Sequence, residues 1–422
     1  MREGLDRLVD ALLGEEAPPT DEGGQEARPT YLLLSSKERL MARYGREGFE
    51  ALDRDLRALG RAVEAHLGLA AKVVYVDDEA TLRPHGLSRA DPADPQQVKA
   101  LIDGLDDRLR ERGGEIRYVL IVGGDGVIPF HRLPNPTEDP DADVPSDNPY
   151  AVRDGNPLVP ERAVGRLPDG ESRPVDFLRS LVQRAIAAHR PRMARGGHSL
   201  LLGLPSRESA QRNGHSQGYS ASVWRKASRA VFQTIGHDQH LRTCPPITYR
   251  EFELEEGVRF AYFNLHGIED GPDWYGQRDP LFPADYPLFP VALRPQDLGE
   301  DTSHLVVFTE ACYGANILGK GPGESIALRF LELGALAVVG STKTAYGAVA
   351  LPLMGADLLG KHFWEGLRSP MSVGEALKYA KVRLAEEMQG QQGYLDGEDQ
   401  KTLVGFVLYG DPSLLAPGPS QK

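Results

Sequence analysis

The sequence has few cysteines and no long apolar run, and each absence narrows what the protein is. Among 422 residues there are two cysteines, Cys244 and Cys312, so disulfides do not organise the fold. No apolar run reaches the roughly 18 residues that a membrane-spanning helix needs. The N-terminal segment MREGLDRLVDALLGEEAPP lacks the continuous apolar core of a signal peptide. We therefore expect a cytoplasmic protein that does not associate with membranes.

Positive charge is also scarce. The chain has 48 Lys and Arg against 61 Asp and Glu, a formal net charge of −13. Nucleic-acid binding requires clustered Lys and Arg to contact phosphates, so we expect no nucleic-acid partner. The hydrophobic share of 41% is that of an ordinary globular protein. The length exceeds the size at which one hydrophobic core stops growing, which predicts two domains or subdomains.

The glycine-rich segment GGDG at residues 123–126 lacks the features of a nucleotide-binding loop. It has neither the Lys-Ser/Thr pair of a P-loop nor the third glycine of a dinucleotide fingerprint. We therefore expect no nucleotide cofactor.

The segment 134–161 is too rich in Pro, Asp and Asn for regular structure, and we expect a long ordered loop or an edge excursion there. It carries a run of carboxylates at Glu138, Asp139, Asp141, Asp143 and Asp147. Such oxygens suit Ca²⁺, but the run lacks EF-hand spacing, and a solvated charged surface is the simpler interpretation. A structural Ca²⁺ is the one cofactor that we keep open, and we expect no catalytic metal.

Apolar runs alternate with helical patterns along most of the chain. The first half predicts strands at 31–35, 72–76 and 118–122 and helices over 41–67, 96–112 and 174–190. The second half predicts strands at 199–204, 260–265, 305–309 and 336–339 and helices from about 222 and over 323–333, 350–366 and 373–388. Continuous apolar strands separated by helices are typical of a parallel sheet covered on both faces.

This pattern predicts an α/β protein of two subdomains, each with a mainly parallel sheet flanked by helices. The boundary is placed at the segment PRMARGG, residues 191–197, where Pro and Gly punctuate the chain. We expect an N-terminal helix and flexible linker over 1–29, an N-terminal α/β subdomain over 30–194, a catalytic subdomain over 195–416 and a disordered tail over 417–422. The polar segment SRESAQRNGHSQGYS, residues 206–220, is predicted to be a loop.

Two predicted strands of the second subdomain end in residues that can do chemistry. FAYFNL is followed at once by His266 and Gly267, and LVVFT is followed by EACYG, in which Cys312 is the central residue. Functional residues of parallel sheets gather at the carboxyl ends of the strands. If the two strands are neighbours, His266 and Cys312 project from the same edge of the sheet.

A thiol and an imidazole at one sheet edge make a nucleophile and its base. The thiolate is the reactive form of cysteine, and an imidazole can accept its proton and later protonate a leaving amine. The backbone N–H groups of Gly267 and Cys312 are candidates for an oxyanion hole. Either residue alone is more often structural, but the pair, each with a nearby glycine, favours a catalytic dyad.

These blocks resemble a known superfamily. NLHG and EACYG are similar to the His-Gly and Ala-Cys-x-Gly signatures of caspase-like cysteine peptidases, which include caspases, legumains, clostripain, separase and gingipains. YVLIVGGDGVIP, SDNPYA, ERAVGRLP and LYGDPSL resemble the gingipain branch in order and spacing, over roughly residues 115–415. The resemblance implies a caspase-like fold of two subdomains and a cysteine endopeptidase that hydrolyses peptide or protein substrates through a thioester.

The resemblance also implies a preference for basic side chains. In several relatives the residue two positions before the catalytic Cys lines the pocket for the side chain that precedes the scissile bond, and Glu310 holds this position. A buried carboxylate there favours Arg or Lys. The gingipains themselves use an acid in a polar loop, and the matching stretch NGHSQGYS contains none.

Three further residues are candidates, two of them, Trp274 and Glu208, by the same resemblance. Trp274 is a candidate wall of the substrate pocket, by stacking on a guanidinium, although an ordinary packing role is nearly as good an interpretation. Asp147 is a candidate substrate contact, and Glu208 is a candidate to orient His266.

A cytoplasmic endopeptidase needs restraint, and we expect a zymogen. The segment 206–220 carries Arg207 and Arg212, where the enzyme itself or an upstream protease would cut. Regulated proteolysis or bacterial defence is the expected setting. Two alternatives stay open: a catalytically silent α/β interaction module, in which His266 and Cys312 are packing relics, and a cysteine amidase that is not a peptidase.

Overall fold

The computed structural model describes residues 28–153, 155–171, 173–190, 215–281, 285–299, 302 and 304–416. Several predictions fall outside these residues: the N-terminal helix and nearly all of its linker, the boundary segment 191–197, the strand at 199–204 and the tail over 417–422. Within the described residues, no helix is both long enough and apolar enough to cross a membrane.

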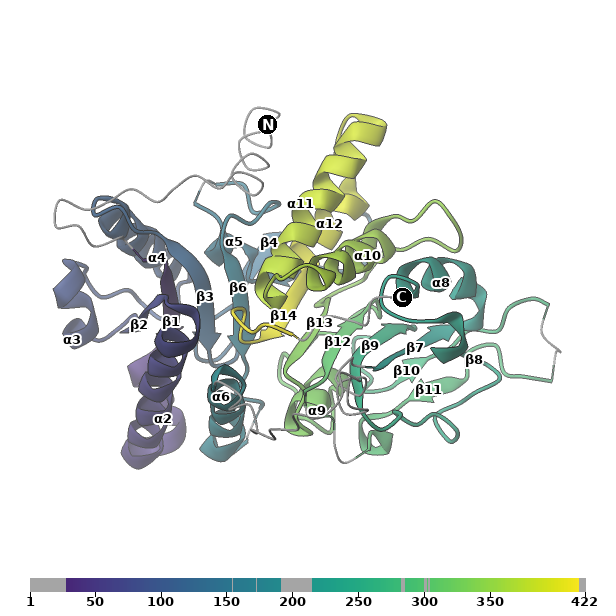
Figure 1. Ribbon diagram of the computed structural model, residues 1–422, viewed down its shortest axis with the longest axis horizontal. Helices are drawn as coiled ribbons and strands as arrows, with labels where there is room; N and C mark the ends of the chain where they lie inside the picture. The colour runs from purple at the N-terminus through teal and green to yellow at the C-terminus, as the bar shows by residue number, and fades with distance from the viewer. Residues whose placement is uncertain are drawn as a thin grey trace, which may run out of the picture.

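The described residues form one large sheet that runs through the molecule (Figure 1). Its ten strands lie in the order β2-β1-β3-β6-β14-β13-β12-β9-β7-β8. The strands are β1 Thr30–Ser35, β2 Ala70–Tyr75, β3 Ile116–Val122, β6 Ala163–Leu167, β7 His215–Ala221, β8 Leu241–Cys244, β9 Val258–Asn264, β12 Val306–Thr309, β13 Ala337–Ser341 and β14 Phe406–Gly410. All neighbours pair in parallel except β13 with β14. The predicted α/β class with mainly parallel pairing is confirmed.

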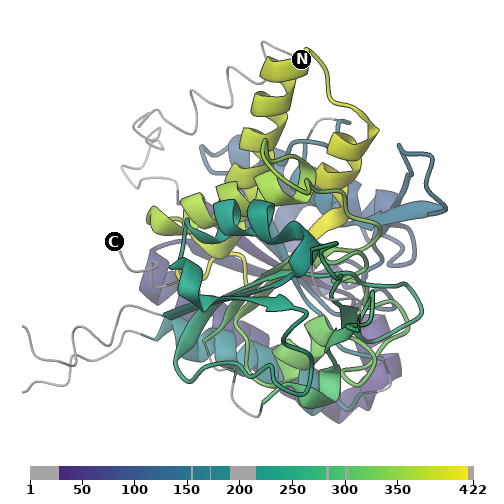
Figure 2. The ribbon, with the colours of Figure 1, turned by 90° about the vertical axis from the view of Figure 1, so that its right-hand side faces the viewer.

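Helices cover both faces of this sheet (Figures 1 and 2). One face carries α2 Lys37–Leu67, α6 Val175–His189 and α9 Ile326–Glu332. The other carries α4 Pro95–Arg110, α8 Arg225–Phe232, α10 Gly355–Arg368, α11 Val373–Gln392 and α12 Gly397–Gly405. The shorter elements are α3 Glu79–Leu82, α5 Asn148–Ala151, the hairpin β4 His131–Pro134 with β5 Asp143–Ser146, the pair β10 Trp274–Tyr275 and β11 Val291–Leu293, and the 3₁₀ turns η1 Arg83–His85, η2 Ser222–Trp224, η3 Asp238–His240 and η4 Pro295–Asp297.

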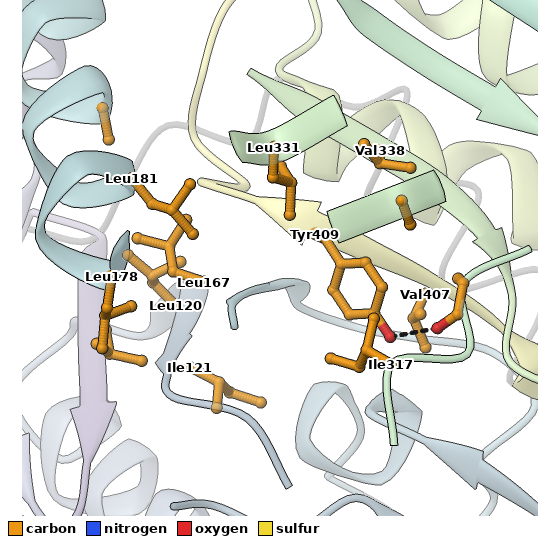
Figure 3. Close-up of a cluster of buried hydrophobic side chains, with 14 of the residues drawn as sticks. Leu120, Ile121, Leu167, Leu178, Leu181, Ile317, Leu331, Val338, Val407 and Tyr409 are labelled. Atoms are coloured by element: carbon orange, nitrogen blue, oxygen red, sulfur yellow. Dashed lines mark hydrogen bonds between the residues drawn. The ribbon is translucent and has the colours of Figure 1, made fainter. Parts of the chain in front are cut away.

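The last strand joins the two halves of the chain into this single sheet. β14 pairs in parallel with β6 of the first half and antiparallel with β13 of the second. Gly165 on β6 lies so close to the carbonyl oxygen of Gly410 that a side chain at 165 would overlap it. Figure 3 shows the apolar side chains that meet along this junction, where Tyr409 donates a hydrogen bond to the Ala315 carbonyl at 2.6 Å.

The polar segment 206–220 was expected to be a loop, and for its described part this is wrong. Residues His215–Ala221 form β7, which lies between β8 and β9. The polar side chains after the exposed His215 are buried because they find backbone acceptors: Ser216 donates to Ile235 O at 2.7 Å and Gln217 to Glu253 O at 2.8 Å. Satisfied polar groups can line a buried strand, and nothing apolar in the sequence marks them.

Regular structure also occurs where a long irregular loop was predicted. The segment 134–161 contains β5 and α5. Conversely, the helix expected over 350–366 begins only at Gly355. Residues 342–354 before it form an irregular loop, and this loop borders the candidate active site described next.

Candidate active site

His266 and Cys312 leave the sheet from neighbouring strands at the same level. β9 and β12 are parallel neighbours, and Phe263 is paired with Thr309. His266 lies three residues beyond Phe263, and Cys312 lies three residues beyond Thr309. The two side chains therefore start from the same edge of the sheet, where functional groups of parallel sheets gather.

The two loops that carry these residues touch. A Cβ atom at Gly267 would overlap the carbonyl oxygen of Cys312, so the position accepts only glycine without a shift of the backbone. Tyr313, directly after the cysteine, has a φ of 55°, in the left-handed region that few residues other than glycine occupy. The chain thus turns sharply as it leaves the thiol.

The His266 ring is held on three sides. Its backbone pairs with Tyr275 through two hydrogen bonds of 2.8 Å. The ring Nε2 lies 2.8 Å from Gln277 Oε1, and the rings of Trp224 and Phe289 lie 4.3 and 5.4 Å away. Because an amide oxygen only accepts, Nε2 carries the proton and Nδ1 keeps the lone pair. Burial lowers the pKa of His266, and the Gln277 hydrogen bond only partly opposes this.

The Cys312 thiol contacts the backbone of the loop 342–354. The N–H of Ala345 points to Sγ at 3.4 Å, and the Ala345 carbonyl lies 3.6 Å from it. Burial raises the pKa of the thiol, and the Ala345 N–H opposes this. His266 and Cys312 both lie in the described part of the chain, and no hydrogen bond joins their side chains there. A raised thiol pKa beside a lowered imidazole pKa favours an uncharged resting pair at neutral pH.

A small cavity opens beside Cys312. Its lining includes Gly267, Trp274, Cys312, Tyr313 and Lys320. Trp274 is 3% exposed and packs on Phe263 at a ring distance of 5.4 Å. Within the described residues, the N–H groups of Gly267 and Cys312 donate to no acceptor other than the cysteine's own thiol.

Glu310 points away from this cavity's lining and into a buried polar cluster. It is 7% exposed, and Tyr262 donates its hydroxyl hydrogen to Glu310 Oε1 at 2.6 Å. Its second neighbour is Asp357, in the first turn of α10, which is fully buried. Asp357 accepts hydrogen bonds from the Ala348 N–H at 2.5 Å and from Asn264 Nδ2 at 3.4 Å.

Two buried carboxyl groups thus lie side by side, and one of them, Glu310, stands two residues before Cys312. Burial, with the charge of Asp357 added, raises the pKa of Glu310 well above its usual range, and burial raises that of Asp357 to about 6. No Lys, Arg or His among the described residues forms an ion pair with either group. A Cβ atom at Gly347, an exposed position of the loop 342–354, would lie 2.6 Å from Asp357 Oδ2. An exposed residue without a side chain thus lies directly against this pair.

The chain matches one family of proteases along most of its length. Residues 51–416 match peptidase family C25. The chain belongs to this family. It is therefore a cysteine peptidase of the gingipain type, as the resemblance of its sequence blocks implied. No curated protein sequence matches the chain significantly.

Solved structures show the same fold at low sequence identity. The C25 peptidase superposes on a structure described as a protease with a TM-score of 0.59 and 16% identity, covering 93% of this chain and 80% of that one. It matches the Arg-specific cysteine proteinase gingipain R (RgpB) with a TM-score of 0.60 and 15% identity, covering 94% of this chain and 80% of that one. It matches the complex of the pro- and mature domains of RgpB from Porphyromonas gingivalis with a TM-score of 0.58 and 14% identity, covering 92% of this chain and 79% of that one.

Asp147, the candidate substrate contact, lies inside the protein. Asp147 is 2% exposed, and its two carboxylate oxygens accept from Arg166 at 2.6 and 3.0 Å. The carboxylate is thus engaged inside the protein and does not face a substrate. Glu208 lies outside the described residues, and the described partner of the His266 ring is Gln277.

The acidic run of the segment 134–161 is engaged by cations of the protein itself. Asp139 and Asp141 both contact the ammonium of Lys401, and Asp147 contacts Arg166. Within the described part of the chain, no group of three or more His, Cys, Asp or Glu side chains is arranged to hold a metal ion. These contacts involve Asp139, Asp141 and Asp147, three of the five carboxylates of the run.

Sequence reasoning missed Gln277, Trp224 and Asp357. None carries a local signal, because each reaches the site only through the arrangement of distant elements. The second cysteine is not part of the site: Cys244 is fully buried at the end of β8, and burial raises its pKa to about 11.

Proposed function

We propose that this C25 peptidase is an endopeptidase that cuts after Arg or Lys, with Cys312 as nucleophile and His266 as base. The observation that carries the proposal is the shared register: both residues stand three positions beyond paired residues of adjacent parallel strands. The contact of Gly267 with the Cys312 carbonyl brings the two loops together.

The proposed reaction follows from these groups. As Sγ of Cys312 attacks the scissile carbonyl carbon, Nδ1 of His266 accepts the thiol proton. The carbonyl oxygen becomes an oxyanion and accepts hydrogen bonds from the N–H groups of Gly267 and Cys312. When the tetrahedral intermediate collapses, the C–N bond breaks and the imidazolium protonates the leaving amine. Water then attacks the thioester with His266 as base, which releases the acid and restores the thiol.

The neutral resting pair gives Gln277 a defined part in this proposal. By accepting the Nε2 hydrogen, its amide oxygen keeps the imidazole in the tautomer whose Nδ1 can act as a base. The thiol loses its proton only when an electrophile is in place, so the resting enzyme holds little thiolate.

The preference for Arg or Lys is supported by the buried pair Glu310 and Asp357. Both carboxyl groups have raised pKa values, and no cation lies among their described neighbours. A substrate guanidinium or ammonium beside them would favour their ionised forms and would itself be bound by the two negative charges. The cavity lined by Trp274 includes neither acid. We therefore assign to Trp274 a contact with a different part of the substrate.

The test is a panel of fluorogenic peptides with Arg, Lys, Asp, Asn or Leu before the scissile bond. The wild type should turn over the Arg and Lys peptides, and Cys312→Ala and His266→Ala should turn over none. Turnover of simple amides without peptides would favour an amidase. A Cys312 that reacts no faster with iodoacetamide than the buried Cys244 would favour a silent interaction module.

We also propose that the enzyme is made as a zymogen and is activated by cleavage, by itself or by an upstream protease. The candidate sites Arg207 and Arg212 lie outside the described residues, so the support is the sequence. The wild type and Cys312→Ala, expressed side by side, separate the two routes. Fragments from the wild type alone would indicate self-cleavage, and two intact chains would exclude it.

We also propose that the enzyme acts inside the cell, in bacterial defence or in another pathway of regulated proteolysis. The support is the cysteine chemistry: both cysteines are unpaired thiols, as is usual in reducing compartments. Immunoblots of cell fractions test the location, and recovery outside the cell would contradict it.

A further inference from the structure

A loop of the first half of the chain reaches the nucleophile of the second half. This acidic loop, residues 135–141, is held by its own side chains. Asn135 Nδ2 donates to Asp139 Oδ1 and to the Asp141 carbonyl, both at 2.9 Å, and the Asp141 N–H donates to Asp139 Oδ1 at 3.0 Å. The loop therefore presents the side chain of Asp141 in a defined direction.

The carboxylate of Asp141 accepts hydrogen bonds from three groups, and the Lys343 ammonium lies 3.7 Å from its Oδ1. Its Oδ1 accepts from the Tyr313 hydroxyl at 2.6 Å. Its Oδ2 accepts from the Thr344 N–H at 3.0 Å and from the Lys401 ammonium at 2.6 Å. The Asp141 and Lys401 side chains are each 1% exposed. Hydrogen bonds to a buried carboxylate are of the strong, charge-assisted kind.

Two of these three groups are neighbours of the residues that surround the thiol. Tyr313 directly follows Cys312, in the left-handed backbone conformation. Thr344 directly precedes Ala345, whose N–H points to the Cys312 Sγ at 3.4 Å. One carboxylate thus holds the chain on both sides of the nucleophile, and the Tyr313 N–H joins the two segments through Lys343 O at 2.9 Å.

The third group supplies the countercharge from another element. Lys401 lies on α12 and also contacts Asp139, whose Oδ2 accepts from the Tyr346 hydroxyl at 2.5 Å. Tyr346 belongs to the same loop 342–354 as Thr344. The acidic loop and α12 therefore hold this loop at two places, which fixes the Ala345 N–H relative to the thiol.

We propose that Asp141 is a positioning residue for Cys312, so that the first half of the chain completes the active site formed by the second. The proposal rests on the proposed role of Cys312 as nucleophile. Asp141 acts through Tyr313 and Thr344 and touches neither substrate nor thiol. The Ala345 N–H stabilises the Cys312 thiolate, and without Asp141 this N–H is no longer held in place. The backbone turn at Tyr313 also loses its anchor.

The test replaces Asp141 by Asn, which has nearly the same shape. Its amide has one acceptor oxygen in place of two and carries no negative charge, so it cannot accept on both sides and forms no ion pair with Lys401. We expect kcat to fall 10- to 100-fold with KM within about twofold. We also expect the pH midpoint for alkylation of Cys312 by iodoacetamide to move upward, because the loss of the Ala345 N–H outweighs the loss of the Asp141 charge, which by itself raises the pKa of the thiol. Glu138→Gln, an exposed acid of the same loop, is the matched control and should change neither.

The alkylation midpoint separates this proposal from the proposed function, because it needs no substrate. If the wild type cleaves no peptide, the proposed function fails and the midpoints still decide the role of Asp141. A lower melting temperature with unchanged kcat and midpoint would make Asp141 purely structural and overturn the proposal. If Asp141→Asn does not fold, Tyr313→Phe removes only one of the three bonds. It should move the midpoint in the same direction, and no movement there would equally overturn the proposal.

Discussion

The backbone of Gly267 lies against the carbonyl group of Cys312, in a space that no side chain can enter. This contact joins the loop after β9 to the loop after β12, and it holds the two backbone N–H groups proposed for the oxyanion hole. The glycine that follows the histidine is thus explained by the close approach of the two chain segments. The same contact makes the site sensitive to a single methyl group.

Gly267→Ala should therefore abolish most of the activity. The added methyl overlaps the Cys312 carbonyl, so one backbone has to shift, at a cost of about 1–3 kcal/mol of folding free energy. We expect kcat/KM for an Arg peptide to fall at least about 100-fold, as for the loss of an oxyanion-hole donor. Gly323→Ala is the matched control, since nothing lies within 4 Å of a Cβ there. An active Gly267→Ala enzyme would contradict the proposed geometry.

Alkylation of Cys312 should become faster with increasing pH through the alkaline range. Burial raises the pKa of the thiol and lowers that of His266. The thiolate fraction therefore grows only as the pH approaches the raised pKa of the thiol, above the ordinary value of about 8.5. The measurement is the rate of iodoacetamide labelling at each pH, followed by mass spectrometry of the peptides that contain Cys312 and Cys244. A rate that is already constant from about pH 6 upward, as expected for a preformed ion pair, would contradict the neutral resting pair.

Removing either buried acid should reduce the preference for basic peptides. Glu310→Gln and Asp357→Asn each leave one carboxyl group for a guanidinium. We expect kcat/KM for the Arg peptide to fall about 10- to 100-fold, the effect of one charge-assisted contact. Any slow turnover of the Leu peptide should stay within about threefold. An equal loss on both peptides would indicate a structural role, and no loss on the Arg peptide would place the basic pocket elsewhere.

The buried pair Glu310 and Asp357 should make the enzyme without substrate less stable at neutral pH. The pKa of Asp357 in the folded protein is raised to about 6. Between the ordinary pKa of an aspartate and this value, Asp357 therefore binds fewer protons in the unfolded chain than in the folded one. Stability is therefore lost as the pH rises through this window and regained as it falls. Asp357→Asn should stabilise the protein at pH 7 by about 1–3 kcal/mol, with the gain shrinking toward pH 4. Urea unfolding at pH 4 and pH 7 measures this difference. A variant less stable than the wild type at pH 7 would contradict the unpaired-carboxyl interpretation.

The local pattern of the chain was enough to predict the α/β class and the pairing of His266 with Cys312. Both residues directly follow apolar strands, and hydrophobic patterning marks such strands without knowledge of their neighbours. In a parallel sheet the ends of adjacent strands coincide, so the strand-end position alone brings the two side chains to one edge. The glycine near each residue is equally a local signal.

The hydrophobic pattern did not predict β7. Its residues read as a polar loop because they contain Ser, Gln and Gly in place of Val and Ile. What makes them a buried strand is a set of acceptors on distant segments, such as Ile235 O for Ser216 and Glu253 O for Gln217. A buried polar group is stable only when such partners exist, and the sequence does not state where they are.

By itself, then, the sequence determined the class of fold, most of its apolar strands and the two residues proposed to do the chemistry. The tertiary structure alone decided what surrounds them: Gln277 at the imidazole, Asp357 beside Glu310 and Asp141 behind the loops that flank the thiol. The reason is the range of the forces involved. The hydrophobic pattern depends on residues that are close in the sequence. The hydrogen bonds and ion pairs of the site join groups that are distant in the sequence and that only the folded chain brings together.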